Sequence, residues 1–342
     1  ILEFGEKEYK NVVYFNTDNN KELDDLFTKE KSPERIILSL SLLSGETILK
    51  DDTLIVLDNV DNLELIKTIK LFGSYLSKYH IIMITSHRDN LNKYKGEELQ
   101  FKFMTNMDYE EYLWARGENE LANLIRESFN KRKTCPFHRL ALDLFSEYLM
   151  TGGMPEVVAA NISGLGAYKI DAIKQKIKDI YIKELTESTN LIDIERSIAV
   201  FNSLPYQLKK DNRKFQYGLL GFGRRKKEYD NAISYLVNNQ IAYRSYKITD
   251  VKSPLSSCRQ PDSFKLYMND EGILYSMLHL SQKEFMANEK VRQILYENHI
   301  AKTLAEANYA LYDYQSEGKA EVDFVIQNRM GKIIPIELAT IS

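Results

Sequence analysis

The stretch Thr53-Leu54-Ile55-Val56-Leu57-Asp58-Asn59-Val60-Asp61 is the most informative part of this 342-residue sequence. Its run of four apolar residues is typical of a strand that is buried on both faces, as in a parallel sheet. The run ends in Asp58, and ligands of open α/β sheets bind at the carboxyl ends of strands. A carboxylate placed there can hold a hydrated Mg²⁺, although a buried strand followed by a polar turn is the commoner explanation of such a pattern.

Two further apolar strands are expected around this stretch. Each consists of an apolar run that ends in polar residues: residues 12–16 (Val-Val-Tyr-Phe-Asn) and residues 81–86 (Ile-Ile-Met-Ile-Thr-Ser). A helical pattern over residues 63–78 separates the second strand from the third, which predicts a right-handed βαβ unit. Three apolar strands that each end in a polar residue indicate a nucleotide-binding sheet.

Composition narrows the class of protein. The chain is 44% hydrophobic and 28% charged, with a net charge of −3, so we expect a soluble, folded protein in which any nucleic-acid surface is a local patch. Cys135 and Cys258 are the only cysteines. They fit no metal motif, and we expect buried thiols in a reducing cytoplasm. No apolar run is long enough to span a bilayer, so no membrane partner is expected.

Helix signals occur along the middle of the chain. Asp108 and Glu111 form a capping-box pattern at the start of a helix predicted over residues 108–126. A second helix, over residues 137–150, is expected to end at two glycines, with Pro155 beginning the next. A later helical pattern, over residues 192–204, is broken by a proline.

The order of eight motifs resembles a group of prokaryotic AAA-like P-loop ATPases that carry a C-terminal region of unknown function. The resemblance covers essentially the whole chain. It implies an α/β multidomain protein with ATP and Mg²⁺ as cofactors. The motifs occupy residues 11–16, 54–61, 82–86, 101–113, 148–156 (YLMTGGMPE), 264–270 (FKLYMND), 321–324 (EVDF) and 335–337 (PIE).

The resemblance also implies four domains. We expect a parallel-sheet ATPase core over residues 1–125, a helical lid over 126–190, a winged helix over 191–280, and a small α+β restriction-endonuclease-like domain over 281–342. The P-loop of the family, G-x-x-x-x-G-K-S/T, occurs nowhere in the sequence. Because its backbone N–H groups cradle the phosphates, we expect an N-terminally truncated core that binds nucleotide poorly without it.

The family's site residues map onto two strand ends. Asp58 takes the position of the Walker-B carboxylate that holds Mg²⁺, and Ser86 takes that of the sensor-1 residue that contacts the γ-phosphate. Asn59 stands where the family usually has the glutamate that polarises the attacking water. An amide cannot act as a general base, so the resemblance implies ATP binding with slow or no hydrolysis. The simpler alternative for Ser86 is a turn at the end of a strand.

Residues 191–280 have the order of a winged helix-turn-helix, with helical patterns followed by strands at 241–248 and 264–268. Basic residues gather just before the helix predicted over 225–239. Such a cluster can grip the phosphates of double-stranded DNA. A solvated surface and a protein-docking winged helix fit the same charges. The predicted DNA-binding residues are Lys209, Lys210, Arg213, Lys214, Arg224, Arg225, Lys226, Lys227 and, on the wing, Arg244.

The last segment resembles the PD-(D/E)XK nuclease core. A helix that includes Glu297 precedes predicted strands that carry Asp323 and Glu337, and these three carboxylates would converge on Mg²⁺. Ala339 occupies the position of the catalytic lysine, so the resemblance implies a nuclease-like fold with weak or absent cleavage. The alternative is that the carboxylates are surface residues of a hairpin.

Three functions are therefore compatible with the sequence. The first is an AAA-like ATP-binding protein that acts as a nucleotide-dependent switch on DNA. The second is a catalytically degenerate binding or assembly module, which is favoured by Asn59, by Ala339 and by the absence of the P-loop motif. The third is a metal-dependent DNA nuclease. The sequence does not indicate the oligomeric state or the protein partner.

Overall fold

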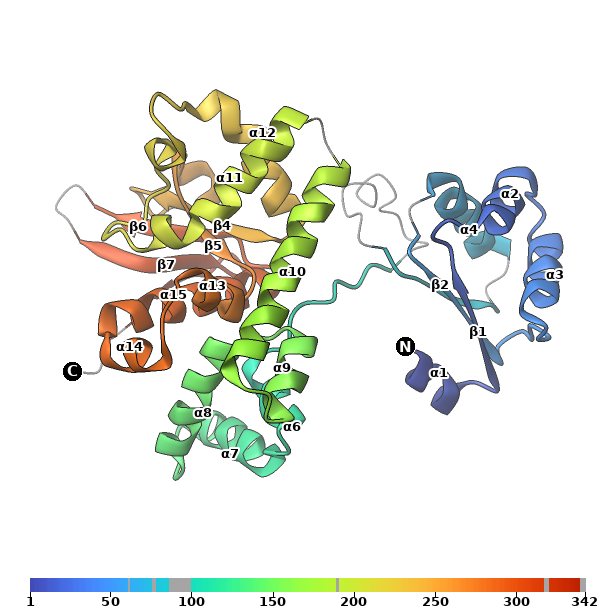
Figure 1. The fold of residues 1–342 in the computed structure, drawn as a ribbon, viewed down its shortest axis with the longest axis horizontal. Coiled ribbons are helices and arrows are strands. Elements are labelled where there is room, and N and C mark those ends of the chain that lie inside the picture. Colours follow the sequence, from blue (N-terminus) through green and yellow to red (C-terminus); the bar gives the residue numbers. More distant parts are fainter. Residues whose placement is uncertain (61, 76–77, 86–99, 189–190, 317–319, 339–342) are drawn as a thin grey trace. The chain divides into compact units, whose positions relative to one another are not determined.

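The structure, a computed structural model, divides the chain into two compact units, Ile1–Phe103 and Met104–Ser342 (Figure 1). The boundary between these two units lies between Phe103 and Met104. Each unit is considered by itself below. The structure describes residues 1–60, 62–75, 78–85, 100–188, 191–316 and 320–338.

The N-terminal unit is built on a parallel sheet with the strand order β1-β2-β3. The strands are β1 (Asn11–Asn16), β2 (Thr53–Asp58) and β3 (His80–Met83). Residues 53–57 of the central strand β2 are all buried. This confirms the prediction of a strand that is buried on both faces. The register places Asn16 beside Asp58, so the polar ends of β1 and β2 meet at the carboxyl edge of the sheet.

Four described helices accompany this sheet: α1 (Leu2–Glu8), α2 (Lys21–Lys29), α3 (Pro33–Ser44) and α4 (Leu63–Tyr75). The side chain of Asn20 caps α2 by accepting from the Leu23 N–H, and α3 ends at Gly45, whose φ is +71°. Apolar residues of α2, α3 and α4 pack on β1 and β2 to form the core of the unit. The predicted strand–helix–strand unit is thus confirmed as β2-α4-β3.

The C-terminal unit begins with the helices α6 (Tyr109–Ala115), α7 (Asn119–Asn130), α8 (His138–Thr151), α9 (Pro155–Ile162) and α10 (Ala167–Ser188). The capping box of Asp108 and Glu111 is confirmed. The single helix predicted over residues 108–126 is wrong, however. Gly117 has a φ of +80°, a left-handed conformation that ends α6 and lets α7 start in a new direction.

The helix α11 (Leu191–Leu208) contains Pro205, where we predicted a break. Proline inside a helix removes one hydrogen bond and costs roughly 3 kcal/mol. Three residues of the same helix, Phe201, Leu204 and Leu208, are almost completely buried in the main core of this unit. Their burial offsets the local penalty, so the helix continues for almost one more turn.

A mixed sheet with the order β5-β4-β6-β7-β8 forms the second half of this unit (Figure 1). Its strands are β4 (Ala242–Ile248), β5 (Arg259–Met268), β6 (Leu311–Gln315), β7 (Glu321–Gln327) and β8 (Ile333–Ile336). β4 and β6 are parallel, and the other pairs are antiparallel. The strands predicted for the winged helix and those predicted for the nuclease-like domain therefore belong to one sheet.

The remaining helices surround this sheet. They are α12 (Lys226–Asn238), α13 (Glu271–Met277), α14 (Gln282–Ala287) and α15 (Glu289–Glu306), with short 3₁₀ turns at Tyr217–Leu220 and Leu255–Cys258. α15 packs against β4, β5 and β6, and α11 packs against α12 and β5. Among the helices of the described residues, none has the length and apolar character that crossing a bilayer requires.

A buried polar network joins α8, α13 and α15. The ammonium group of Lys302 donates to Glu271 Oε2 at 3.0 Å and to the Tyr148 hydroxyl at 3.1 Å. His299 Nδ1 lies 2.7 Å from the other oxygen of Glu271. Burial raises the pKa of Glu271, but the charges of Lys302 and the hydrogen bond from His299 outweigh it and lower that pKa to about 2. The network thus holds a charged pair inside the core.

The turn between α8 and α9 is fastened to the start of α13. Asp270 accepts hydrogen bonds from the backbone N–H groups of Gly153 and Ile273, each at 2.9 Å. A Cβ atom on Gly272 would lie 2.0 Å from the carbonyl oxygen of Thr151. Only glycine allows the two backbones to approach this closely.

Candidate functional site

The carboxylate of Asp58 lies at the carboxyl edge of the parallel sheet and is held from two sides. The Tyr14 hydroxyl donates to Oδ2 at 2.5 Å, and the backbone N–H of Asn59 donates to Oδ1 at 2.9 Å. The hydrogen bond to Asp58 raises the pKa of Tyr14, so the phenol remains a donor. A carboxylate has about four lone-pair positions, and these two contacts leave room for water molecules of a hydrated cation.

Asn59 shapes the turn after β2. Its φ is +56°, a left-handed conformation that asparagine adopts more easily than most residues. Its side-chain amide donates to Asn16 Oδ1 at 3.1 Å, and the Thr17 hydroxyl lies within hydrogen-bond distance of the carbonyl oxygens of both Asp58 and Asn59. Asn59 therefore positions the strand end. Ser86, predicted to sense the γ-phosphate, lies outside the described residues.

The nine predicted DNA-binding residues differ in their exposure. Residues 209–227, which we name the basic segment, run from the end of α11 through the first two residues of α12. Six of the nine predicted side chains are exposed, and all six lie in this segment: Lys209, Lys210, Lys214, Arg224, Arg225 and Lys227. Lys226 forms an ion pair with Asp262 of β5.

The other two, Arg213 and Arg244, point into protein surroundings. The guanidinium of Arg244 lies over the rings of Phe264 and Tyr246, with 5.0 and 5.5 Å to the ring centres, and donates to the Tyr246 hydroxyl at 2.7 Å. Arg213 has a side chain only 18% exposed and forms an ion pair with Glu297. These contacts hold both guanidinium groups against the fold, although the Nε atom of each is buried and has no hydrogen-bond partner. Neither arginine therefore extends from the surface as a phosphate contact would require.

Glu297, predicted as a metal ligand, is the centre of a buried cationic cluster. Its side chain is 2% exposed. Besides Arg213, it contacts the ammonium group of Lys265 at 3.4 Å and accepts from the Tyr267 hydroxyl at 2.5 Å. Burial lowers the pKa of both Arg213 and Lys265 and raises that of Tyr267 well above its usual value. The observed partners of Glu297 are therefore two cations and a phenol of its own chain.

The other two predicted ligands do not join Glu297 at a metal centre. Asp323 is half-buried and accepts from the backbone N–H of Leu338 at 2.8 Å. Glu337 is exposed at the end of β8. Within the described ranges, no three acidic, histidine or cysteine side chains are arranged to hold a metal ion. The three predicted ligands therefore form no such group there. Asp323 nevertheless acts on the two cations that contact Glu297, because burial lowers the pKa of Arg213 and Lys265 and the charge of Asp323 partly opposes that effect. Ala339 lies outside the described residues.

One acidic residue near this cluster was not predicted. Asp313 of β6 is buried and accepts from the Ser245 hydroxyl at 3.2 Å. Burial raises its pKa, and the charge of Lys265 partly opposes that effect. The signal in the sequence was the single carboxylate within the apolar strand pattern Ala310-Leu311-Tyr312-Asp313-Tyr314, since strand interiors seldom contain Asp.

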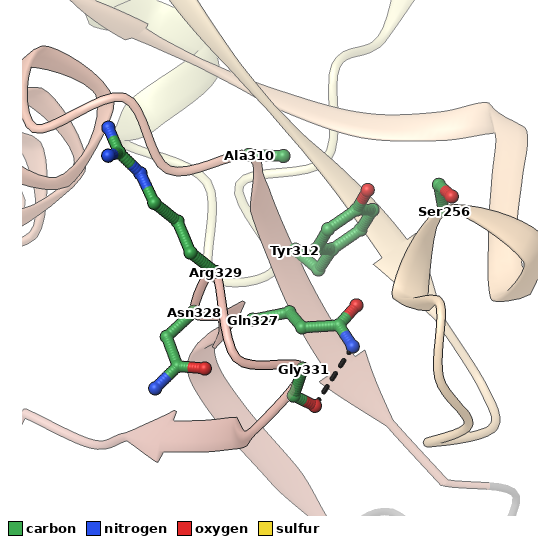
Figure 2. Close-up of a pocket in the computed structure, with 7 residues that line it drawn as sticks. All are labelled: Ser256, Ala310, Tyr312, Gln327, Asn328, Arg329 and Gly331. Atoms are coloured by element: carbon green, nitrogen blue, oxygen red, sulfur yellow. Dashed lines mark hydrogen bonds between the residues drawn. The ribbon is translucent and has the colours of Figure 1, made fainter.

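A pocket of about 420 Å³ lies between the turn before β8 and the loop that contains Ser256. Figure 2 shows Tyr312 and Ser256 on one side of it and the Arg329 guanidinium directed away from them. The Gln327 side chain forms a wall by bonding to Gly331 O at 3.0 Å and to the Ser253 hydroxyl at 2.7 Å. The polar groups of this pocket do not converge on one point. The pocket is therefore a weaker candidate site than the sheet edge at Asp58 or the basic segment.

Comparison with known proteins gives one match. Residues 142–284 match the model of a family described as a domain of unknown function, DUF8612. No curated protein and no solved structure matches the chain. The matched part includes the basic segment and Arg244. It excludes Asp58, Glu297, Asp323 and Glu337, so no activity is assigned to any of the predicted sites by similarity.

Proposed function

We propose that the protein is an AAA-like ATP-binding switch that acts on DNA, with nucleotide and Mg²⁺ at the carboxyl edge of the parallel sheet and DNA on the basic segment. The observation that carries the proposal is the exposure of the six Lys and Arg side chains of that segment. Clustered, solvent-exposed cations attract phosphates and release counterions when they bind, which favours nucleic acid over neutral partners.

The anchoring of the basic segment supports this proposal. Gln207, at the end of α11, donates to Gln216 O at 3.0 Å and accepts from Gln216 N at 2.9 Å. Phe215 N donates to Phe264 O at 2.8 Å, which ties the segment to β5. The exposed cations therefore stand on a backbone that is held in place, which limits the entropy lost when they bind phosphates.

The nucleotide half of the proposal rests on Asp58. Mg²⁺ would neutralise the charge of the β- and γ-phosphates, and Asp58 would hold it through its coordinated water. Tyr14 would keep that carboxylate in place by its hydrogen bond. Asn59 supplies no base, so the switch would depend on nucleotide binding more than on rapid hydrolysis.

DNA binding is tested by the salt dependence of duplex affinity. A double variant, Lys209→Ala with Lys210→Ala, should weaken binding and reduce the slope of log K against log salt by about two, because each lost phosphate contact removes about 0.9. The matched control is Lys283→Ala with Lys290→Ala, which removes two exposed lysines outside the basic segment. Equal effects of the two variants would contradict the proposal.

Nucleotide binding is tested by measuring Mg²⁺-dependent ATP binding to this chain. Asp58→Ala should abolish the Mg²⁺-dependent part of that binding, and Asp52→Ala, which removes another carboxylate of the same unit, should leave it unchanged. The second candidate function is a non-catalytic binding module, which the burial of Glu297 against Arg213 favours over a nuclease. DNA binding without any ATP binding would support that candidate.

A further inference from the structure

Phe222 is a fully exposed aromatic side chain, with 107% of its reference accessible area. It lies in residues 218–225, which we name the Phe222 loop. Exposed phenylalanine gains nothing for folding, since none of its apolar surface is removed from water. Its position within the basic segment is therefore better explained by a partner than by stability.

The chain anchors the base of the Phe222 loop with other aromatic rings. Tyr217 packs edge-on against Phe215, with ring centres 5.2 Å apart, and Phe215 stacks on Phe264 at 5.5 Å. Tyr217 also lies 6.4 Å from the ring of Tyr229 on α12. The aromatic residues at the base are thus packed into the unit, and Phe222 is the one held out in water by the loop.

A cationic side chain lies beside Gly221, the residue that precedes Phe222. Gly221 and Gly223 have φ values of +135° and +76°, which glycine adopts without strain. A Cβ atom placed on Gly221 would lie 3.5 Å from Cγ and from Nε of Arg224, so the Arg224 side chain runs alongside the residue next to Phe222. No acidic residue occurs between Asn212 and Lys227, which argues for an anionic partner.

We propose that the Phe222 loop binds DNA whose bases are unpaired, with Phe222 stacked on a base and Arg224 and Arg225 on the neighbouring phosphates. A side chain at a loop tip reaches the face of a base only when that base is unstacked, and stacking on an aromatic ring tolerates any base. This inference rests on the DNA binding proposed above and adds to it the class of DNA.

The experiment compares the affinities of the full chain for oligo-dT and for a fully paired duplex. Phe222→Ala should weaken binding to oligo-dT by between about fivefold and a hundredfold, the usual effect of losing one stacked aromatic ring, and leave duplex affinity unchanged. The matched control is Phe129→Ala, since Phe129 is also 81% exposed and precedes Lys131, Arg132 and Lys133.

A second readout does not depend on affinity. Trp114 is the only tryptophan of the chain, so Phe222→Trp adds one reporter at the loop tip. Its fluorescence should be quenched by oligo-dT, beyond any change seen for Trp114 alone in the wild-type protein. If the wild-type protein binds neither DNA, the proposed function fails and this inference with it. If the wild-type protein binds DNA, three results would overturn this inference alone. The first is an equal loss of affinity for oligo-dT and duplex in Phe222→Ala, and the second is an equal loss of oligo-dT affinity in Phe129→Ala and Phe222→Ala. The third is the absence of quenching in Phe222→Trp.

Discussion

Arg213 and Glu297 form an ion pair inside the C-terminal unit, although the sequence suggested DNA contact for the first and metal binding for the second. Arg213 has a φ of +46°, an unusual conformation for a residue with a side chain. The pair joins the basic segment to α15. The free-energy cost of this backbone conformation is therefore found where it places a cation against a carboxylate that is almost completely buried.

Removing this cation should destabilise the C-terminal unit. Arg213→Ala leaves Glu297 with Lys265 and Tyr267 as its remaining partners, and breaking a buried ion pair typically costs about 3 kcal/mol. Urea unfolding followed by the fluorescence of Trp114 measures the change. The control, Lys209→Ala, removes an exposed cation four residues away and should change the free energy of unfolding by less than about 0.5 kcal/mol. A stable Arg213→Ala protein with weak DNA affinity would instead place Arg213 at the DNA surface.

The stability of the same unit should fall as the pH rises through neutrality. Burial raises the pKa of Glu306 from 4.5 to about 7, although Lys302 and the Tyr243 hydroxyl oppose that effect. The folded protein therefore binds a proton that the unfolded chain releases between these values, and the stabilisation is lost as the pH increases. Urea unfolding at pH 5 and pH 8 tests this. Glu306→Gln should show a smaller difference between the two pH values, and an unchanged difference would refute the assignment.

Glutamate should not be tolerated at position 59 without loss of stability. Asn59 has a left-handed φ of +56°, which costs most other residues roughly 1–2 kcal/mol. Asn59→Glu also removes the hydrogen bond to Asn16. We expect faster amide hydrogen exchange in β2 for this variant and a smaller increase for Asn59→Gly, which also loses that hydrogen bond but adopts the left-handed φ without strain. Equal exchange in the two variants would show that the backbone conformation is unimportant.

Alanine at position 272 should disrupt the junction of α8, α9 and α13. Its Cβ atom would lie 2.0 Å from the carbonyl oxygen of Thr151, and the backbone atom cannot rotate away, so we expect destabilisation of about 3 kcal/mol or more. The thermal midpoint of the unit is the measurement. Gly218→Ala is the control, because a Cβ atom there meets nothing within 4 Å among the described residues and its φ is not left-handed.

The strands could be predicted closely from the sequence, whereas the directions of several side chains could not. Apolar runs such as residues 54–57 identify a buried strand without knowledge of its neighbours. Arg213 looked like its exposed neighbours because a local charge count does not show which way a turn directs a side chain. Asp323 lies where the pairing of β6 and β7 changes register, and such a shift breaks the alternation from which the face of a strand residue is predicted.

The prediction of the candidate site from the sequence was limited in the same way. Asp58 could be placed at a strand end because the apolar run stops there. Its partner Tyr14 could not be identified, since the parallel register that brings β1 beside β2 is a property of the fold. Lys265 and Tyr267, which contact Glu297, come from a strand about 30 positions earlier in the chain. No spacing rule connects residues so far apart.

The continuous sheet of the C-terminal unit has a consequence for dissecting the protein. β4 pairs with β5 on one edge and with β6 on the other, but the matched family ends at residue 284, before α15 and β6 begin. A fragment cut at that boundary would present the open edge of β4 and an uncovered apolar face, both of which promote self-association. The family match therefore ends before the sheet is complete, and fragments for biochemistry should retain residues through β8.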